Sequence, residues 1–247
     1  MFKWSCRVTK AIGILVALVA LASCQSYVDT THPPALTVFA AASLQPPFDK
    51  IARQAKVDAR FNYAGTQTLT AQLTQGAQAD VFASADTAHM KTVQDAGLLA
   101  SPTKIFAHNR LEIAVEKGNP KGIHTLADLA RPGLVVVLAD PSVPAGKYAQ
   151  QALAKAKVTV HPASLEPQVT GVLSKVSLGE ADAGIVYVSD IVTSGKVDGV
   201  EVPDDDNVVA DYSIASLSRR SAADQFIAFV LSSQGQAILV NAGFEKA

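Results

Sequence analysis

Cysteine is scarce in this sequence: Cys6 and Cys24 are the only two among 247 residues. Aromatic residues make up 6% of the chain, and there is no basic excess, since the net charge at pH 7 is −1. Without a basic surface, the chain is a poor candidate for nucleic-acid binding. The five histidines show no spacing typical of a metal site. No G-x-S-x-G motif is present to mark a hydrolase nucleophile.

Hydrophobic residues, by contrast, make up 49% of the chain. With so few aromatics, this is the composition of an α/β protein rich in alanine and valine. No low-complexity tract and no repeat of solenoid period is visible. A chain of 247 residues is long enough for one large domain or two small ones, each with a real core.

The first residues are typical of a targeting segment. Lys3, Arg7 and Lys10 form a basic start, and residues 11–20 are an apolar run too short to be a comfortable membrane span. Residues 21–24 (LASC) follow and resemble a bacterial lipobox, in which the cysteine is lipidated. An ordinary secretory signal with a chance cysteine, or an uncleaved anchor, are the alternatives.

We therefore expect residues 1–23 to be a lipoprotein signal peptide, Cys24 to carry the lipid, and the polar residues 24–35 to be a tether. Loss of residues 1–23 removes three positive charges and no acid, so the net charge falls from −1 to −4. Cys24 would then be the only cysteine, which excludes an intramolecular disulfide.

A buried strand followed directly by a helix is expected around Ser43. Residues 36–39 are β-branched or apolar, and from Leu44 onward apolar residues recur at three- and four-residue spacing. We expect Ser43 to be the N-cap of this helix. Helix starts expose unpaired N–H groups with partial positive charge, so the same place suits an anion. Whether Ser43 only caps the helix or also binds a ligand stays open at this point.

The same order of strand, small residues, hydroxyl and helix recurs along the chain. Residues 59–63 form an expected strand, and Gly65 and Thr66 follow it, with Thr66 as an N-cap or a ligand donor. Further strands are expected at 79–83, 134–139, 158–160 and 183–188, each with a helix after it. Such alternation predicts parallel sheets covered by helices, with ligands bound at the carboxyl ends of the strands.

Two long extended stretches, 105–115 and 208–217, are expected to pass between two groups of these elements. They predict two lobes around a cleft: residues 36–106 and 211–247 in the first lobe, and residues 107–210 in the second. The fold class is therefore α/β.

Five separated motifs together resemble the periplasmic molybdate-binding proteins of ABC importers. They are residues 38–44 (VFAAASL), 64–69 (AGTQTL), 79–86 (ADVFASAD), 143–148 (VPAGKY) and 184–190 (GIVYVSD). They occur in the order and rough spacing of that family, and the resemblance covers nearly all of residues 36–245. It implies a type II periplasmic-binding-protein fold, with two α/β lobes, a two-segment hinge and an oxyanion held in the cleft.

The resemblance also implies a set of ligand-binding residues. The family's hydroxyl ligands correspond to Ser43, Thr66 and Tyr187, and its backbone ligands to Ala145 and Val169. At Thr66 relatives often carry serine, and threonine keeps the hydroxyl. The match around Val169 is looser than the others. Taken alone, Tyr187 could equally be a core tyrosine.

The chemistry of these residues suits the implied ligand. Molybdate is fully deprotonated near neutral pH, so its oxygens only accept hydrogen bonds, and hydroxyls and backbone N–H groups can donate them. Protonated phosphate would need a carboxylate acceptor, and the five motifs place none among the ligands. Discrimination against sulfate would rest on cavity size, because the two anions present the same acceptors.

We interpret the chain as a lipid-anchored solute-binding protein that captures molybdate, and also tungstate, and delivers it to an ABC permease. We expect a monomer without catalytic residues or cofactor, and no direct bond from the protein to the metal. Its place would be the periplasm or the outer face of the cell membrane. The alternatives are a binder of sulfate or another tetrahedral oxyanion, a serine hydrolase using Ser43, and a sensor or adhesion lipoprotein. Arg219 and Arg220 could form an anion clamp, although exposed arginines are more common.

Overall fold

The structure is a computed structural model, and it describes Met1 and residues 35–247. The expected signal peptide apart from Met1, the lipidation site Cys24 and all of the expected tether except Ala35 lie outside the described residues. None of the helices that the structure describes combines the length and the apolar character needed to cross a bilayer.

The first sheet has five strands in the order β2-β1-β3-β10-β4. The strands are β1 (Leu36–Ala41), β2 (Ala59–Ala64), β3 (Val81–Ser84), β4 (Lys104–Asn109) and β10 (Ala210–Ser216). β1 pairs parallel with β2 and β3, whereas β10 runs antiparallel to β3 and β4. The carboxyl ends of β1, β2 and β3 therefore meet at one edge of this sheet.

The second sheet also has five strands, in the order β7-β6-β8-β5-β9. Its strands are β5 (Leu111–Glu116), β6 (Val136–Ala139), β7 (Ser164–Glu166), β8 (Ala183–Tyr187) and β9 (Val197–Glu201). β6 pairs parallel with β7 and β8, and β5 is antiparallel to β8 and β9. Every residue of β6 and β8 is buried, as expected for aliphatic strands covered on both faces. The strand expected at 158–160 is absent, and the chain pairs later, at β7.

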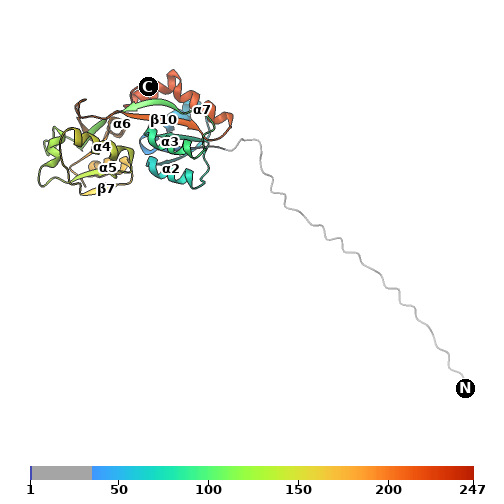
Figure 1. Cartoon of the computed structure of the whole chain (residues 1–247), viewed down its shortest axis with the longest axis horizontal. Helices are drawn as coiled ribbons and strands as arrows, with labels where there is room; N and C mark the ends of the chain where they lie inside the picture. Colours follow the sequence, from blue (N-terminus) through green and yellow to red (C-terminus); the bar gives the residue numbers. More distant parts are fainter. Residues whose placement is uncertain (2–34) are drawn as a thin grey trace. The chain divides into compact units, whose positions relative to one another are not determined.

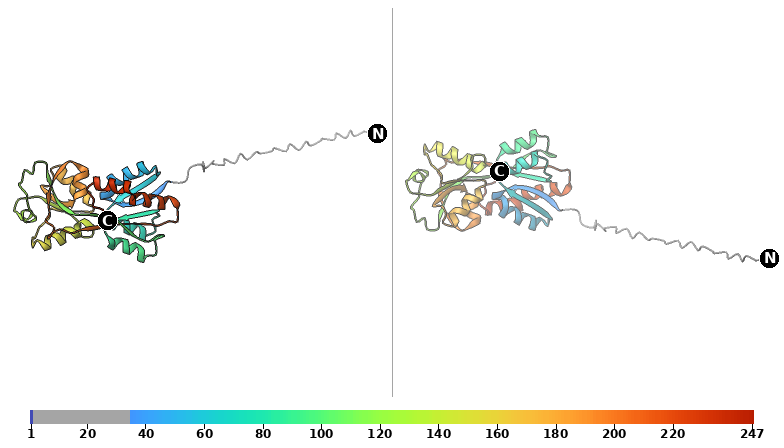
Figure 2. Two further views of the ribbon diagram at one scale, coloured as in Figure 1. Left: turned by 90° about the horizontal axis from the view of Figure 1, so that it is seen from above. Right: turned by 90° about the horizontal axis from the view of Figure 1, so that it is seen from below.

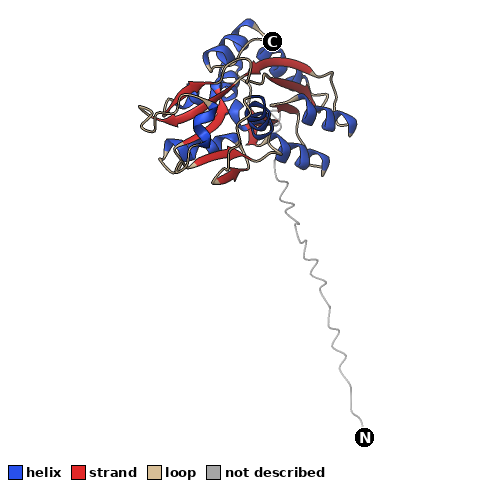
Figure 3. Cartoon of the chain, turned by 60° about the vertical axis from the view of Figure 1, so that its left-hand side comes forward, coloured by secondary structure: helices blue, strands red, loops and turns tan. Residues whose placement is uncertain are grey.

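Helices cover the faces of both sheets (Figure 3). The first lobe carries η1 (Ala42–Leu44), α1 (Gln45–Ala55), α2 (Thr66–Thr74), α3 (Thr87–Asp95), α7 (Ser221–Leu231) and α8 (Ser233–Asn241). The second carries η2 (Leu126–Ala130), α4 (Pro144–Lys155), α5 (Val169–Ser177) and α6 (Val188–Ser194). Figure 1 shows α2, α3 and α7 in one lobe and α4, α5 and β7 in the other.

The C-terminal helices return to the lobe in which the described chain begins. Both views of Figure 2 place the blue and red parts of the ribbon together, apart from the yellow and orange part. An aromatic cluster explains this return, because Phe226 of α7 packs edge-on against Phe48 of α1, with ring centroids 5.5 Å apart. Phe48 also contacts Phe61 of β2 and Phe106 of β4. The core of the first lobe thus joins residues from both ends of the described chain.

The chain passes between the sheets twice, at Arg110 and again between β9 and β10. β4 keeps its place in the first sheet as far as Asn109, so the expected division between residues 106 and 107 falls inside this strand. Asn207 joins the two passages, since its side chain accepts from the Leu111 N–H at 3.0 Å and donates to the Leu111 carbonyl at 2.9 Å. Arg110 adds an ion pair to Asp204 at 2.8 Å. These contacts hold the two hinge segments side by side.

Candidate functional site

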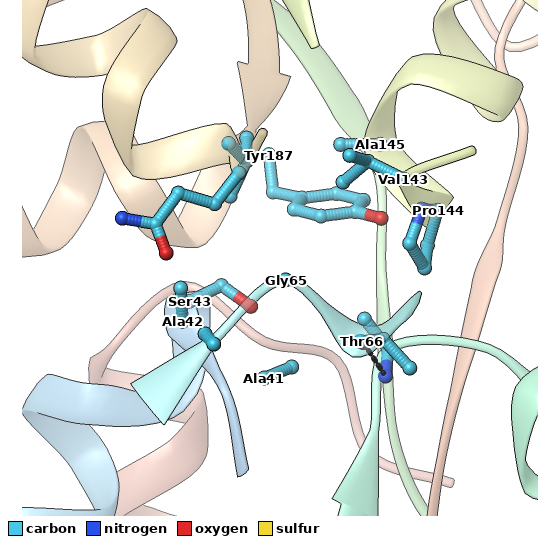
Figure 4. A pocket seen from close by; sticks show the side chains of 13 residues that line it. Ala41, Ala42, Ser43, Gly65, Thr66, Val143, Pro144, Ala145 and Tyr187 are labelled. Atoms are coloured by element: carbon cyan, nitrogen blue, oxygen red, sulfur yellow. Dashed lines mark hydrogen bonds between the residues drawn. The ribbon is translucent and has the colours of Figure 1, made fainter. Parts of the chain in front are cut away.

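A small pocket lies between the two lobes, at the ends of strands from both sheets (Figure 4). Ser43, Thr66, Ala145, Val169 and Tyr187 all line it, so the structure brings the five predicted site residues together. The full lining is Ala41, Ala42, Ser43, Ala64, Gly65, Thr66, Ala85, Val143, Pro144, Ala145, Gln168, Val169 and Tyr187. Figure 4 shows Ser43 and Thr66 on one side of the space and Tyr187 and Ala145 on the other.

Ser43 is buried, with 3% of its surface exposed, but it is not a helix N-cap. It lies inside the short 3-10 helix η1, whose N-cap is Ala41, and α1 begins only at Gln45. Neither helix start receives a side-chain hydrogen bond. The Ser43 hydroxyl instead lies 2.8 Å from the hydroxyl of Tyr212. The predicted capping role is therefore wrong, because a tertiary partner holds this hydroxyl.

Thr66 is the first residue of α2, and Gly65 occupies the N-cap position. Of the two roles expected for Thr66, capping is therefore wrong. Its hydroxyl oxygen accepts a hydrogen bond from the Ala85 N–H at 3.2 Å, drawn as the dashed line in Figure 4. A hydroxyl that accepts in this way still has its own proton to donate. The geometry thus fits the other expected role, that of a donor to a ligand.

Ala145 and Val169 lie in the first turns of α4 and α5, whose N-caps are Val143 and Gln168. No side chain caps either of these helix starts. The first N–H groups of a helix have no partner within it and carry partial positive charge. Both residues are buried, so the two helix starts present backbone donors to the pocket.

Gly146 allows the turn before α4 to be this tight. A Cβ at this position would lie 2.1 Å from the carbonyl oxygen of Asp140 and 2.4 Å from that of Ala139. Any side chain would push the start of α4 away from the end of β6. The V-P-A-G sequence therefore fixes the place of the Ala145 N–H relative to its sheet.

Tyr187 ends β8, and 1% of its surface is exposed. Its hydroxyl is buried and makes no hydrogen bond to any residue that the structure describes. A buried polar group without a partner costs on the order of 1–3 kcal/mol. Burial also raises the pKa of Tyr187 well above its ordinary value, so the hydroxyl keeps its proton at neutral pH. The pocket thus contains an unpaired donor.

None of the described lining residues carries a charge. The pocket is narrow, so only a small ligand fits in this closed arrangement. Among the described residues, no group of three or more histidine, cysteine or acidic side chains is placed to hold a metal ion. Neutral O–H and N–H groups converging on a small space can bind a compact anion without a buried counter-charge.

Asp190 lies directly behind Tyr187. The Tyr187 N–H donates to its carboxylate at 3.0 Å, and 3% of the residue is exposed. Burial raises the pKa of Asp190 from 3.8 to about 7, against the opposing effect of that hydrogen bond. Below neutral pH this carboxyl is therefore largely uncharged, which limits its repulsion of an anion in the pocket.

The titration of Asp190 predicts a pH dependence of stability. Between pH 4 and 7 the carboxyl ionises in the unfolded chain while it stays protonated in the folded one, so wild-type stability falls as the pH rises. Asp190→Asn keeps an acceptor for the Tyr187 N–H and removes the titration. We expect the free energy of unfolding of the variant, relative to that of the wild type, to increase by roughly 1.4 kcal/mol for each pH unit across this range.

Urea unfolding of both unliganded proteins at pH 4 to 8 measures this gain. If the two free energies of unfolding differed by the same amount at every pH, the raised pKa of Asp190 would be contradicted.

Two contacts of the site were not predicted from the sequence. Tyr212 on β10 supports Ser43 from behind, and Gln67 of α2 reaches the other lobe, where its amide donates to the Pro167 carbonyl at 2.9 Å. No local pattern marks either residue. The anion clamp considered as one possibility for Arg219 and Arg220 is not at the pocket, since neither residue lines it and Arg220 forms an ion pair with Asp80 at 2.7 Å.

Residues 36–245 match the model of a protein family described as bacterial extracellular solute-binding protein. The molybdate-binding protein ModA of Mycobacterium tuberculosis is 48% identical over 220 residues, which are 85% of this chain and 84% of that protein. The ModA protein of Escherichia coli is 36% identical over 196 residues, covering 73% of this chain and 76% of that protein.

One solved structure is similar to this chain both in fold and in sequence. The substrate-binding domain of a putative molybdenum ABC transporter from Clostridium difficile superposes with a TM-score of 0.66 at 31% identity, covering 86% of this chain and 99% of that domain. The two-lobed α/β fold expected from the sequence is thereby confirmed.

Proposed function

Because the chain belongs to the family of bacterial extracellular solute-binding proteins, we propose that it captures molybdate outside the cytoplasm and delivers it to an ABC importer. It is a binding protein and not an enzyme. The observation that carries the proposal is the pocket itself, where uncharged donors from two lobes surround a space that contains the unpaired hydroxyl of Tyr187.

In this proposal the hydroxyls of Ser43, Thr66 and Tyr187 and the N–H groups of Ala145 and Val169 donate to the oxygens of the anion. The first two residues belong to the first lobe and the other three to the second. The anion therefore bridges the lobes and favours their closed arrangement, which is how a ligand shifts a two-state equilibrium. Without a buried lysine or arginine, the site also avoids the cost of desolvating a second charge.

Tungstate is the second ligand that we propose, because it has the same charge, shape and acceptor groups as molybdate. Anchoring through a lipid on Cys24 is a further part of the proposal and rests on the lipobox-like residues 21–24. A single acyl chain holds a protein to a membrane only marginally, so multiple acylation of the cysteine is implied. We propose that the mature protein acts as a monomer.

Calorimetric titration of residues 25–247 with molybdate, tungstate, sulfate and phosphate tests the proposal. We expect molybdate and tungstate to bind much more tightly than the other two. Sulfate offers the same acceptors on a smaller tetrahedron and should leave some of the donors unpaired, at roughly 1–3 kcal/mol for each donor. Phosphate carries a proton for which the described lining has no carboxylate acceptor.

Tightest binding of sulfate would reject molybdate as the ligand and support the alternative oxyanion binder. Titration with sodium chloride at matched ionic strength is the control for a non-specific charge effect.

A further inference from the structure

Tyr212 contacts the site without lining the pocket. It lies on β10, is completely buried, and its hydroxyl oxygen is 2.8 Å from that of Ser43. Its ring meets that of Tyr187 edge-on, with centroids 5.8 Å apart. One side chain therefore contacts a proposed ligand residue of each lobe from behind.

The direction of the hydrogen bond between Tyr212 and Ser43 decides what Ser43 can offer to a ligand. Either hydroxyl can be the donor at this distance. If Ser43 donates to Tyr212, its single proton is used there and the pocket faces only lone pairs, which repel an anion. If Tyr212 donates to Ser43, the proton of Ser43 is available to the pocket. An anion without protons is compatible only with the second arrangement.

We propose that Tyr212 is a positioning residue that donates its hydroxyl proton to Ser43 and thereby directs the hydroxyl proton of Ser43 toward the bound anion. This inference rests on the proposed function. Two hydroxyls in a chain also polarise each other, so the donor behind Ser43 strengthens the hydrogen bond in front of it. Tyr212 acts on the anion through Ser43 and not by touching it.

The surroundings of Tyr212 keep its hydroxyl protonated and its ring in place. Burial raises its pKa far above the ordinary value, so it keeps its proton. The rings of Phe106 and Phe244 pack edge-on against it, with centroids at 6.3 and 5.1 Å, and hold the ring in place. Replacing the tyrosine by phenylalanine keeps these ring contacts and removes only the hydroxyl.

A double-mutant cycle tests the inference by calorimetric titration with molybdate. The four proteins are the wild type, Ser43→Ala, Tyr212→Phe and the double variant. We expect Tyr212→Phe to weaken binding roughly two- to ten-fold, the value of one hydrogen bond. In the Ser43→Ala background the same change should have no further effect, because the residue through which Tyr212 acts is missing. A purely structural tyrosine would not show this dependence on Ser43.

The matched control is Tyr63→Phe in the same lobe. The Tyr63 hydroxyl donates to Asp49 at 2.8 Å and lies outside the pocket, so its loss should leave molybdate affinity unchanged. Equal losses from Tyr212→Phe in both backgrounds, or no loss in either, would overturn the inference alone. Failure of the wild type to bind molybdate would instead overturn the proposed function, and the inference with it.

Neutron diffraction of the wild-type molybdate complex provides a second test that does not depend on a folded variant. It should place a deuterium on the Tyr212 oxygen, pointing at Ser43. A deuterium on Ser43 pointing at Tyr212 would refute the inference.

Discussion

Replacing Tyr187 by phenylalanine is expected to weaken molybdate binding by roughly 1.5–3 kcal/mol, or about 10- to 150-fold, while leaving the unliganded protein as stable as before or slightly more stable. The hydroxyl is buried and makes no hydrogen bond within the described residues. Its removal therefore costs the unliganded fold nothing in lost contacts. In the complex it would be a donor to a doubly charged anion, where each hydrogen bond is strong.

The opposite signs of these two effects make the prediction specific. Affinity is measured by calorimetric titration, and stability by urea unfolding without anion. Tyr148→Phe is the matched control, because Tyr148 is a half-buried tyrosine of the same lobe that does not line the pocket. If Tyr187→Phe lowered stability and spared affinity, Tyr187 would be a core tyrosine, as the sequence alone allowed.

Gly65→Ala is expected to weaken binding by preventing the lobes from closing fully. The backbone of Gly65 has φ −57° and ψ 137°, which alanine adopts without strain. A Cβ here would lie 2.6 Å from the carbonyl oxygen of Pro167, across the cleft, and close to the flexible side chain of Gln67. Gln67 can move within its own lobe, whereas the Pro167 backbone belongs to the other lobe.

The methyl group is thus compatible with each lobe separately but not with their closed arrangement. Overpacking of this kind costs roughly 1–3 kcal/mol, which here becomes about a 5- to 150-fold loss of molybdate affinity. Small-angle scattering should show that molybdate compacts the wild type and compacts the variant less. Thermal unfolding of the unliganded variant should be unchanged.

A matched control adds a methyl group inside one lobe. A Cβ at Gly171 would lie 3.2 Å from the Cβ of Glu166, in the same lobe, so Gly171→Ala should leave the anion-induced compaction intact. Full compaction and full affinity in Gly65→Ala would show that closure does not bring these two segments together in solution.

Local sequence patterns were sufficient for most of the strands and helices, whereas the five residues of the candidate site were implied by the resemblance to molybdate-binding proteins, and all five line the pocket. Each of those residues stands where a strand gives way to a helix, and that change of periodicity is visible without a structure. The patterns were insufficient where the pairing of strands sets the bounds of an element. A strand was expected to begin at residue 158, six residues before β7, whose three residues include two that are only partly buried. The boundary between the lobes was expected after residue 106, whereas β4 stays paired in the first sheet as far as Asn109.

The roles of the hydroxyls were also beyond local reasoning. Serine or threonine before a helix normally caps it, and the sequence has no information on competing partners. Ser43 instead contacts Tyr212, which is 169 positions away in the chain, and Gln67 contacts Pro167 at a separation of 100 positions. The first contact needs β10 to return to the first sheet, and the second needs the two lobes to meet.

The residues and their periodicity determined the elements, the α/β character of the two lobes and the supply of uncharged donors at helix starts, because these depend on neighbours a few positions apart. Tertiary structure decided which donors face one another, which hydroxyl is left unpaired and which tyrosine stands behind Ser43. These are properties of surfaces that meet only when two sheets, built from interleaved parts of the chain, close on the same space.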